Sequence, residues 1–92
     1  MRILTTIVIV DDEEEILTAL EQMLSGEGYV VKAFSSSKEA ESYLKTKTAD
    51  LAVFDIKMPE LDGFSLLKSV RVHRPSLPII FLSSKAEEQD QI

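Results

Sequence analysis

The chain has 92 residues, which is the size of one small domain, and its hydrophobic content of 45% is ordinary for a globular protein. Sixteen acidic residues against ten basic ones give a net charge of −6, which argues against nucleic-acid binding by this domain alone. There is no cysteine, so disulfides and thiolate metal sites are excluded. We find no signal peptide and no membrane-spanning stretch, and we therefore expect a cytoplasmic protein.

The first part of the chain alternates apolar runs with an amphipathic segment. Residues 7–10 form a β-branched run without polar alternation, which is typical of a central strand in a parallel sheet. Apolar residues then recur at helical spacing over residues 13–25, and Asp12 is expected to cap this helix. Residues 29–34 predict a second strand, and Lys32 favours an edge position for it because it interrupts the apolar run.

A second helix and a third strand follow. Ser36 and Glu39 have the spacing of a capping box at the start of the helix. A polar connector then leads to residues 51–54, four successive apolar residues that are too few for a helix and therefore predict a buried strand. This strand ends on a single carboxylate, Asp55, and proline and glycine supply the loop after it.

A third helix is expected after this loop. It is marked by Phe64, Leu67 and Val70, with Leu66 beside them. Pro75 ends the helix, and residues 79–82 form a fourth strand. Three strand–helix units followed by a strand predict an α/β fold, a doubly wound parallel sheet with right-handed crossovers and helices on both faces. The first strand is expected to be the most central because it is the most apolar.

Polar side chains follow three of these strands. Asp11 and Asp12 end the first strand, Asp55 ends the third and Ser83 ends the fourth. In a parallel sheet these ends meet at one edge, so we expect the side chains to converge. Crowded carboxylates repel one another, and their pKa values rise unless a cation is shared, which favours Mg²⁺ with its preference for oxygen ligands. A metal-neutralised aspartate beside a hydroxyl suits an aspartyl-phosphate intermediate.

The ends of the predicted strands carry three motifs. They read Val10-Asp11-Asp12-Glu13, then Asp55-Ile56-Lys57-Met58-Pro59 with Asp62-Gly63, and finally Phe81-Leu82-Ser83-Ser84. In this order and at this spacing they closely resemble the receiver domain of response regulators in two-component signalling. The resemblance covers the whole chain and implies a flavodoxin-like receiver architecture.

The resemblance also implies a role for each matching residue. Asp55 is the phosphoacceptor, which takes a phosphoryl group from the phosphohistidine of a sensor histidine kinase or phosphotransfer protein. Asp12 binds Mg²⁺ directly, Asp11 binds it through water, and Lys57 contributes its backbone carbonyl. Ser83 is the switch hydroxyl, with Ser84 as the competing position. Such a domain controls an output domain or effector, and it is not an enzyme beyond its own phosphorylation and dephosphorylation.

One departure from the family pattern concerns the end of the sequence. Receiver domains continue with a fifth strand that begins with a lysine, an aromatic switch residue and a final helix, whereas this sequence ends at Ile92. Lys85 follows Ser83 too closely to replace that lysine. We therefore expect residues 1–92 to form a receiver domain truncated after the fourth strand. Its open fourth strand is expected to favour self-association.

Other functions fit the sequence less well. The acidic turn after the first strand would repel the phosphate of a flavin, and there is no P-loop motif for a nucleotide. An aspartate-dependent phosphatase would need a second acid two residues after Asp55, where Lys57 stands. The structural alternative to a metal site is that Asp11 and Asp12 only cap the helix that follows them. The functional alternative is a receiver-like interaction module that works without phosphorylation.

Overall fold

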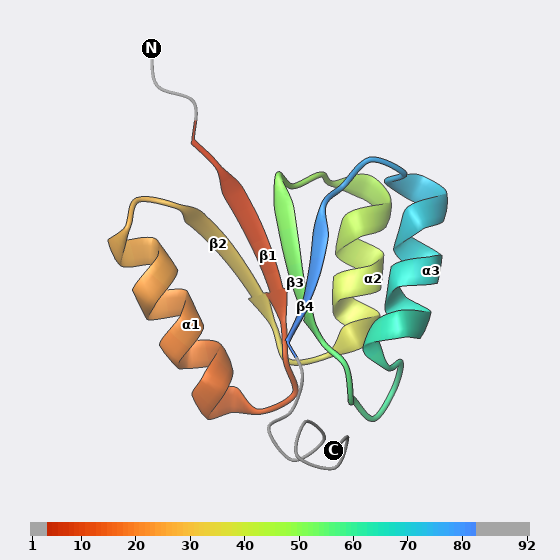
Figure 1. Ribbon diagram of the computed structural model, residues 1–92, viewed down its shortest axis with the longest axis horizontal. Coiled ribbons are helices and arrows are strands. Elements are labelled where there is room, and N and C mark those ends of the chain that lie inside the picture. The colour runs from red at the N-terminus through yellow and green to blue at the C-terminus, as the bar shows by residue number, and fades with distance from the viewer. Residues whose placement is uncertain (1–3, 83–92) are drawn as a thin grey trace, which may run out of the picture.

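The computed structural model describes residues 4–82, which form an alternating series of strands and helices (Figure 1). In chain order the elements are β1 (Thr6–Val10), α1 (Glu14–Gly26), β2 (Val30–Phe34), α2 (Ser37–Thr46), β3 (Leu51–Asp55), α3 (Gly63–His73) and β4 (Ile79–Leu82). The predicted alternation is confirmed, and each predicted strand or helix lies within one or two residues of its observed bounds. None of the helices in this described part is long and apolar enough to cross a membrane.

The described strands form one parallel sheet in the order β2-β1-β3-β4. Val10 pairs with Phe34 of β2 on one side and with Phe54 of β3 on the other, so β1 is internal. In the described sheet β3 is internal as well, so the prediction that the first strand is the most central one is confirmed only in part. The edge position predicted for β2 from Lys32, which is exposed, is also confirmed. β4 forms the other edge of the described sheet, and its last residue, Leu82, is the register partner of Asp55.

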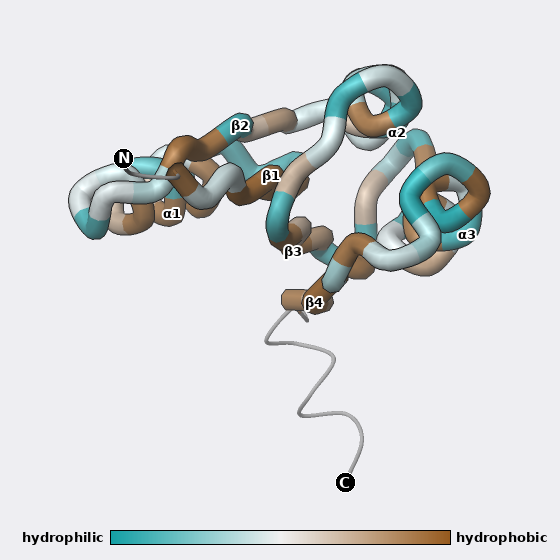
Figure 2. The backbone as a smooth tube through the Cα atoms, turned by 90° about the horizontal axis from the view of Figure 1, so that it is seen from above, coloured by the Kyte–Doolittle hydropathy of each residue, from teal (hydrophilic) through white to brown (hydrophobic). Residues whose placement is uncertain are grey.

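Helices cover both faces of this sheet, which confirms the doubly wound α/β fold. Viewed from above, the line of strands separates α1 from α2 and α3 (Figure 2). Alternate residues of β1 point to the two sides: Ile7 and Ile9 pack with Leu17 of α1, whereas Val8 and Val10 belong to the cluster under α2 and α3. Burial on both faces explains why β1 has a continuous apolar sequence rather than an alternating one.

The cap predicted for α1 is wrong. The residue at the N-cap position is Glu13, whose side chain makes no capping hydrogen bond. Instead, the Oδ1 atom of Asp11 accepts a hydrogen bond of 2.8 Å from the backbone N–H of Glu13. Asp11 therefore holds the turn between β1 and α1, and the side chain of Asp12 is left exposed. The physical reason is that an aspartate readily accepts from the amide two residues ahead, so the earlier of the two acids closes the turn.

Side chains cap the other two helices. Of the two hydrogen bonds that make a capping box, the first is confirmed at α2: the Ser36 hydroxyl accepts a hydrogen bond of 3.2 Å from the backbone N–H of Glu39. α3 begins with a cap that we did not predict: the Asp62 Oδ1 atom accepts a hydrogen bond of 2.8 Å from the N–H of Ser65. This cap sets Gly63 as the first helical residue.

The apolar face predicted for α3 is only partly correct. Leu66 and Val70 are buried together with Gly63, whereas Phe64 keeps 51% of its surface exposed. Gly63, Leu66 and Val70 share one face of the helix because they are three and four positions apart, whereas Phe64 lies about 100° from Gly63 around the helix axis. Its ring instead packs against Phe81 of β4, with ring centroids 4.8 Å apart.

The burial of α3 makes a prediction about stability. Leu66 is fully buried in the cluster that contains Phe54, so Leu66→Ala leaves a cavity and should lower the free energy of unfolding by about 2–5 kcal/mol. Val72, on the same helix, is 77% exposed, and Val72→Ala should change it by less than about 0.5 kcal/mol. Urea unfolding followed by circular dichroism measures both, and equal losses would contradict this packing.

Candidate functional site

Three carboxylates gather at the carboxyl edge of the sheet. Asp11 directly follows β1, Asp12 comes next, and Asp55 is the last residue of the neighbouring strand β3. One carboxylate oxygen of each lies within 4.8 Å of the others. In the described part of the chain, these three side chains form a group whose carboxylates are close enough together to share one metal ion. The structure thus brings together three of the residues that the sequence pointed to, and their roles stay predictions.

Of the other two expected site residues, the structure describes Lys57 and not Ser83. Lys57 lies in the loop two residues after Asp55 and is exposed to solvent. Ser83 and its competitor Ser84 lie outside the described residues. The described strand β4 ends at Leu82, whose partner across the sheet is Asp55, so the carboxyl end of β4 lies at the edge where the acids gather.

The three carboxylates are held in different ways. Asp11 is only 4% exposed, and its Oδ1 atom is occupied by the N–H of Glu13. The Oδ1 atom of Asp55 accepts a hydrogen bond of 2.9 Å from the N–H of the next residue, Ile56. Asp12 is exposed. Two acids are thus fixed by the backbone of the turns that follow them, and the third faces solvent.

Burial and mutual repulsion raise the pKa values of two of these acids. Burial is the main cause for Asp55, and the charge of Asp11 adds to it, so its pKa rises from 3.8 to about 6 despite the hydrogen bond from Ile56. Burial also raises the pKa of Asp11, where the hydrogen bond from Glu13 opposes it and the charge of Asp12 adds to it. A cation among the three would relieve this repulsion. The donors are all carboxylate oxygens, which fits a hard ion such as Mg²⁺.

The loop that carries Lys57 is tied to the start of α2. The buried hydroxyl of Ser37 accepts a hydrogen bond of 2.9 Å from the N–H of Leu61. The hydroxyl of Ser36 donates to the Oε1 atom of Glu60 at 2.8 Å. Sequence reasoning assigned Ser36 only to helix capping and missed both ties, because their partners lie 24 residues away in sequence.

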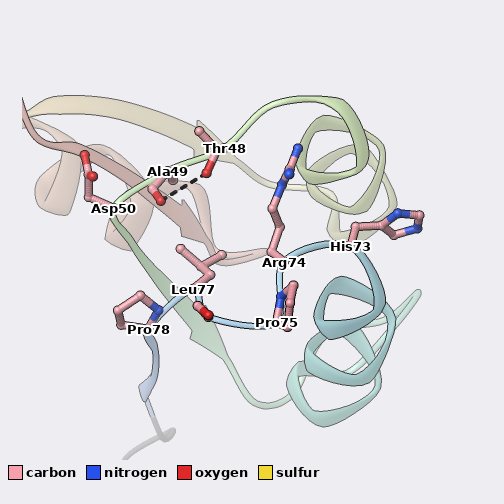
Figure 3. A pocket seen from close by; sticks show the side chains of 9 residues that line it. Thr48, Ala49, Asp50, His73, Arg74, Pro75, Leu77 and Pro78 are labelled. Carbon is pink, nitrogen blue, oxygen red and sulfur yellow. Dashed lines mark hydrogen bonds between the residues drawn. The ribbon is translucent and has the colours of Figure 1, made fainter.

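A hollow of about 370 Å³ lies at the amino edge of the sheet, where the strands begin, opposite the acidic cluster (Figure 3). It is lined by Thr48, Ala49, Asp50, His73, Arg74, Pro75, Ser76, Leu77 and Pro78.

Two charged side chains that line this hollow, Arg74 and Asp50, make hydrogen bonds to backbone groups. The Nε atom of Arg74 donates to the carbonyl oxygens of Leu44 and Lys47, at 3.0 and 3.1 Å, and so closes the end of α2. The Oδ2 atom of Asp50 accepts from the N–H of Thr6 at 2.8 Å. The hollow contains no member of the acidic cluster.

Comparison with known proteins decides the family. Residues 7–92 match the family described as the response regulator receiver domain. The chain belongs to this family. Regulatory protein VanRc of Enterococcus gallinarum is 38% identical to this receiver domain over 86 residues, which are 94% of this chain and 37% of the relative. The alkaline phosphatase synthesis transcriptional regulatory protein PhoP of Bacillus subtilis is 40% identical over 86 residues, which cover 94% and 36% of the two chains. The receiver domain thus spans little more than a third of these curated relatives.

Solved structures confirm the receiver fold. A CheY-like receiver domain protein from Methanospirillum hungatei JF-1 superposes with a TM-score of 0.85 and 32% identity, covering 96% of this chain and 72% of that one. TrrA from Thermotoga maritima, solved in complex with Mg²⁺ and BeF, superposes with a TM-score of 0.84 and 27% identity, covering 97% and 77%. The receiver family and the flavodoxin-like architecture expected from the sequence are both confirmed. The expected extent of the domain, residues 1–92, stays a prediction.

The raised pKa of Asp55 predicts how stability depends on pH without metal. The pKa rises from 3.8 to about 6 on folding, so between about pH 4 and pH 6 the folded state binds more protons than the unfolded one. The free energy of unfolding should therefore fall as the pH rises through this window. Asp55→Asn should remove that part of the fall and be more stable than the wild type at pH 7. Urea unfolding with a chelator from about pH 4 to 8 tests this, and parallel curves for the two proteins would contradict it.

Proposed function

We propose that this receiver domain is a phosphoacceptor that takes a phosphoryl group onto Asp55, in a reaction that requires Mg²⁺, from a phosphohistidine of a sensor histidine kinase or phosphotransfer protein. The observation that carries the proposal is the cluster of Asp11, Asp12 and Asp55, whose carboxylate oxygens lie within 4.8 Å of one another. Membership of the receiver family supports it. The domain is a signalling component rather than a metabolic enzyme.

The surroundings of Asp55 suit it as the acceptor. Asp11 is almost fully buried, whereas Asp55 is partly exposed at the end of its strand. The Oδ1 atom of Asp55 is held by the N–H of Ile56, which makes Oδ2 the oxygen proposed to act as the nucleophile. Oδ2 can therefore attack phosphorus as the bond from phosphorus to the histidine nitrogen breaks, and the electron pair leaves with the imidazole.

The acidic cluster fits a bound Mg²⁺. Asp11, Asp12, Asp55 and the backbone carbonyl of Lys57 are the groups that would hold it. When bound, Mg²⁺ supplies positive charge to the phosphoryl oxygens and to the crowded carboxylates. TrrA, the structural relative in complex with Mg²⁺ and BeF, supports this assignment for the present chain.

The response to phosphorylation is proposed to run through Ser83. A hydroxyl after β4 could donate a hydrogen bond to the phosphoryl group on Asp55, because Asp55 and Leu82 are register partners at the edge of the sheet. The resulting change of conformation would control an output domain or effector. The curated relatives support this link, since VanRc is named a regulatory protein and PhoP a transcriptional regulatory protein.

Two further expectations from the sequence stay predictions. Self-association through the fourth strand is supported by the position of β4 at the edge of the described sheet and by Ile80, which is 51% exposed. A binding module that works without phosphorylation is less favoured than a phosphoacceptor, because the acidic cluster is intact.

Labelling with acetyl phosphate and Mg²⁺ tests the proposed function. The wild type should gain the mass of one phosphoryl group, and Asp55→Asn should gain none, because an amide is not a nucleophile at this step. Asp50→Asn is a matched control at the opposite edge of the sheet and should be labelled like the wild type. Intact mass spectrometry reads all three. Labelling of Asp55→Asn would place the acceptor elsewhere, and a wild type that is never labelled would favour the binding module.

The two acids after β1 are expected to differ in Mg²⁺ binding. Asp12 is exposed and free to touch the ion, whereas Asp11 already accepts from the N–H of Glu13 and is proposed to act through water. Asp11→Asn, which can still accept that hydrogen bond, should weaken Mg²⁺ affinity by about tenfold, and Asp12→Asn by more. Calorimetric titration measures both, and the reverse order would exchange the two roles.

A further inference from the structure

The first residue of α3, Gly63, lies directly against the backbone of the strand that ends in Asp55. A Cβ atom on Gly63 would lie 3.1 Å from the Cα atom of Ile56 and 3.2 Å from the carbonyl carbon of Asp55, and it would overlap the carbonyl oxygen of Asp55. We infer that Gly63 is a positioning residue for the phosphoacceptor: its missing side chain lets the start of α3 seat against the Asp55–Ile56 peptide and set the orientation of the Asp55 carboxylate. The inference rests on the proposed function of Asp55.

Space, rather than backbone conformation, requires glycine at this position. Among the described residues the glycine with a positive φ is Gly28, so the backbone of Gly63 is one that any L-residue can adopt. Gly26 shows that the close approach does not follow from glycine being helical, because a Cβ atom there would meet nothing within 4 Å. The constraint at Gly63 is therefore local to its contact with the end of β3.

This contact acts on the same peptide that holds the acceptor side chain. The carbonyl oxygen of the Asp55–Ile56 peptide faces Gly63, and the N–H of that peptide donates to Asp55 Oδ1 at 2.9 Å. The next carbonyl, that of Ile56, accepts a hydrogen bond of 2.7 Å from the N–H of Gly63. A shift of the peptide therefore moves the N–H that fixes one carboxylate oxygen, and it changes where the other oxygen points.

The helix cannot easily move away to make room for a side chain. Leu66 and Val70 are 0% and 2% exposed and anchor α3 in the core, and the Asp62 cap fixes where the helix begins. Interiors packed in this way transmit strain rather than absorb it. A methyl group on Gly63 would therefore displace the end of β3, and with it the acceptor carboxylate.

Gly63→Ala tests the inference, with Gly26→Ala as the matched control. In the metal-free chain, the NMR signals of the Asp55 carboxyl carbon and the Ile56 amide should shift in Gly63→Ala and stay at their wild-type positions in Gly26→Ala. The affinity for Mg²⁺ with beryllofluoride, measured by calorimetry, should fall on the order of tenfold to hundredfold in Gly63→Ala, because displacement by about 1 Å costs this much at a reacting centre. Gly26→Ala should bind like the wild type.

The outcomes separate positioning from a purely structural role. A folded Gly63→Ala with wild-type signals and affinity would overturn the inference. If the variant is only marginally folded, thermal melts replace calorimetry: a ligand that binds the native state raises the melting temperature according to its affinity, and a rise as large as in the wild type would also overturn it. Failure to fold even with ligand and a stabilising osmolyte would assign Gly63 to the fold alone. If the wild type and Gly26→Ala bind neither Mg²⁺ nor beryllofluoride, the proposed function fails. The NMR signals of Asp55 and Ile56 in the metal-free chain then still decide the role of Gly63.

Discussion

The burial and mutual repulsion of carboxylates at one end of the sheet are the constraint on which this site depends. The parallel pairing of β1 with β3 places Asp11, Asp12 and Asp55 at one edge, with oxygens within 4.8 Å of one another. Burial and neighbouring charge together raise the pKa of Asp55 to about 6, so the arrangement is unfavourable at neutral pH without a cation. A cation bound among the three carboxylates would relieve the repulsion, and perturbed pKa values of this kind cluster at functional sites. That combination is what a metal-dependent phosphoacceptor needs.

The remainder of the structure supplies the restraint. β1 is buried on both faces between α1 on one side and α2 and α3 on the other, so the strand that delivers two of the acids cannot shift. The loop after Asp55 is held to α2 through Ser36 and Ser37, and its far end is closed by the hydrogen bond from Gly63 to Ile56. Asp55 therefore lies on a short segment that is fixed at both ends. Small changes in this segment are expected to act on the carboxylate directly.

The two edges of the sheet use charge in opposite ways. At the amino edge, Arg74 and Asp50 are engaged with backbone groups and close the ends of α2 and β1. At the carboxyl edge, Asp12 stays exposed, and burial together with neighbouring negative charge raises the pKa values of Asp11 and Asp55 despite their backbone hydrogen bonds. Groups with strongly perturbed pKa values cluster at functional sites. This contrast distinguishes the acidic cluster from the hollow at the other edge.

The sequence by itself determined the fold class and the composition of the acidic cluster. Apolar runs such as residues 7–10, each followed by polar residues, identified the parallel strands, and the rule that such strands end at one edge brought Asp11, Asp12 and Asp55 together. Tertiary structure alone decided that Asp11 rather than Asp12 holds the turn after β1, and that Leu66 rather than Phe64 faces the core. It also decided that Gly63 is required by space rather than by its φ angle. The reason is physical: hydrophobic periodicity is encoded locally, whereas which acid reaches an amide and which atom meets a helix start depend on the register of strands and the packing of segments far apart in the chain.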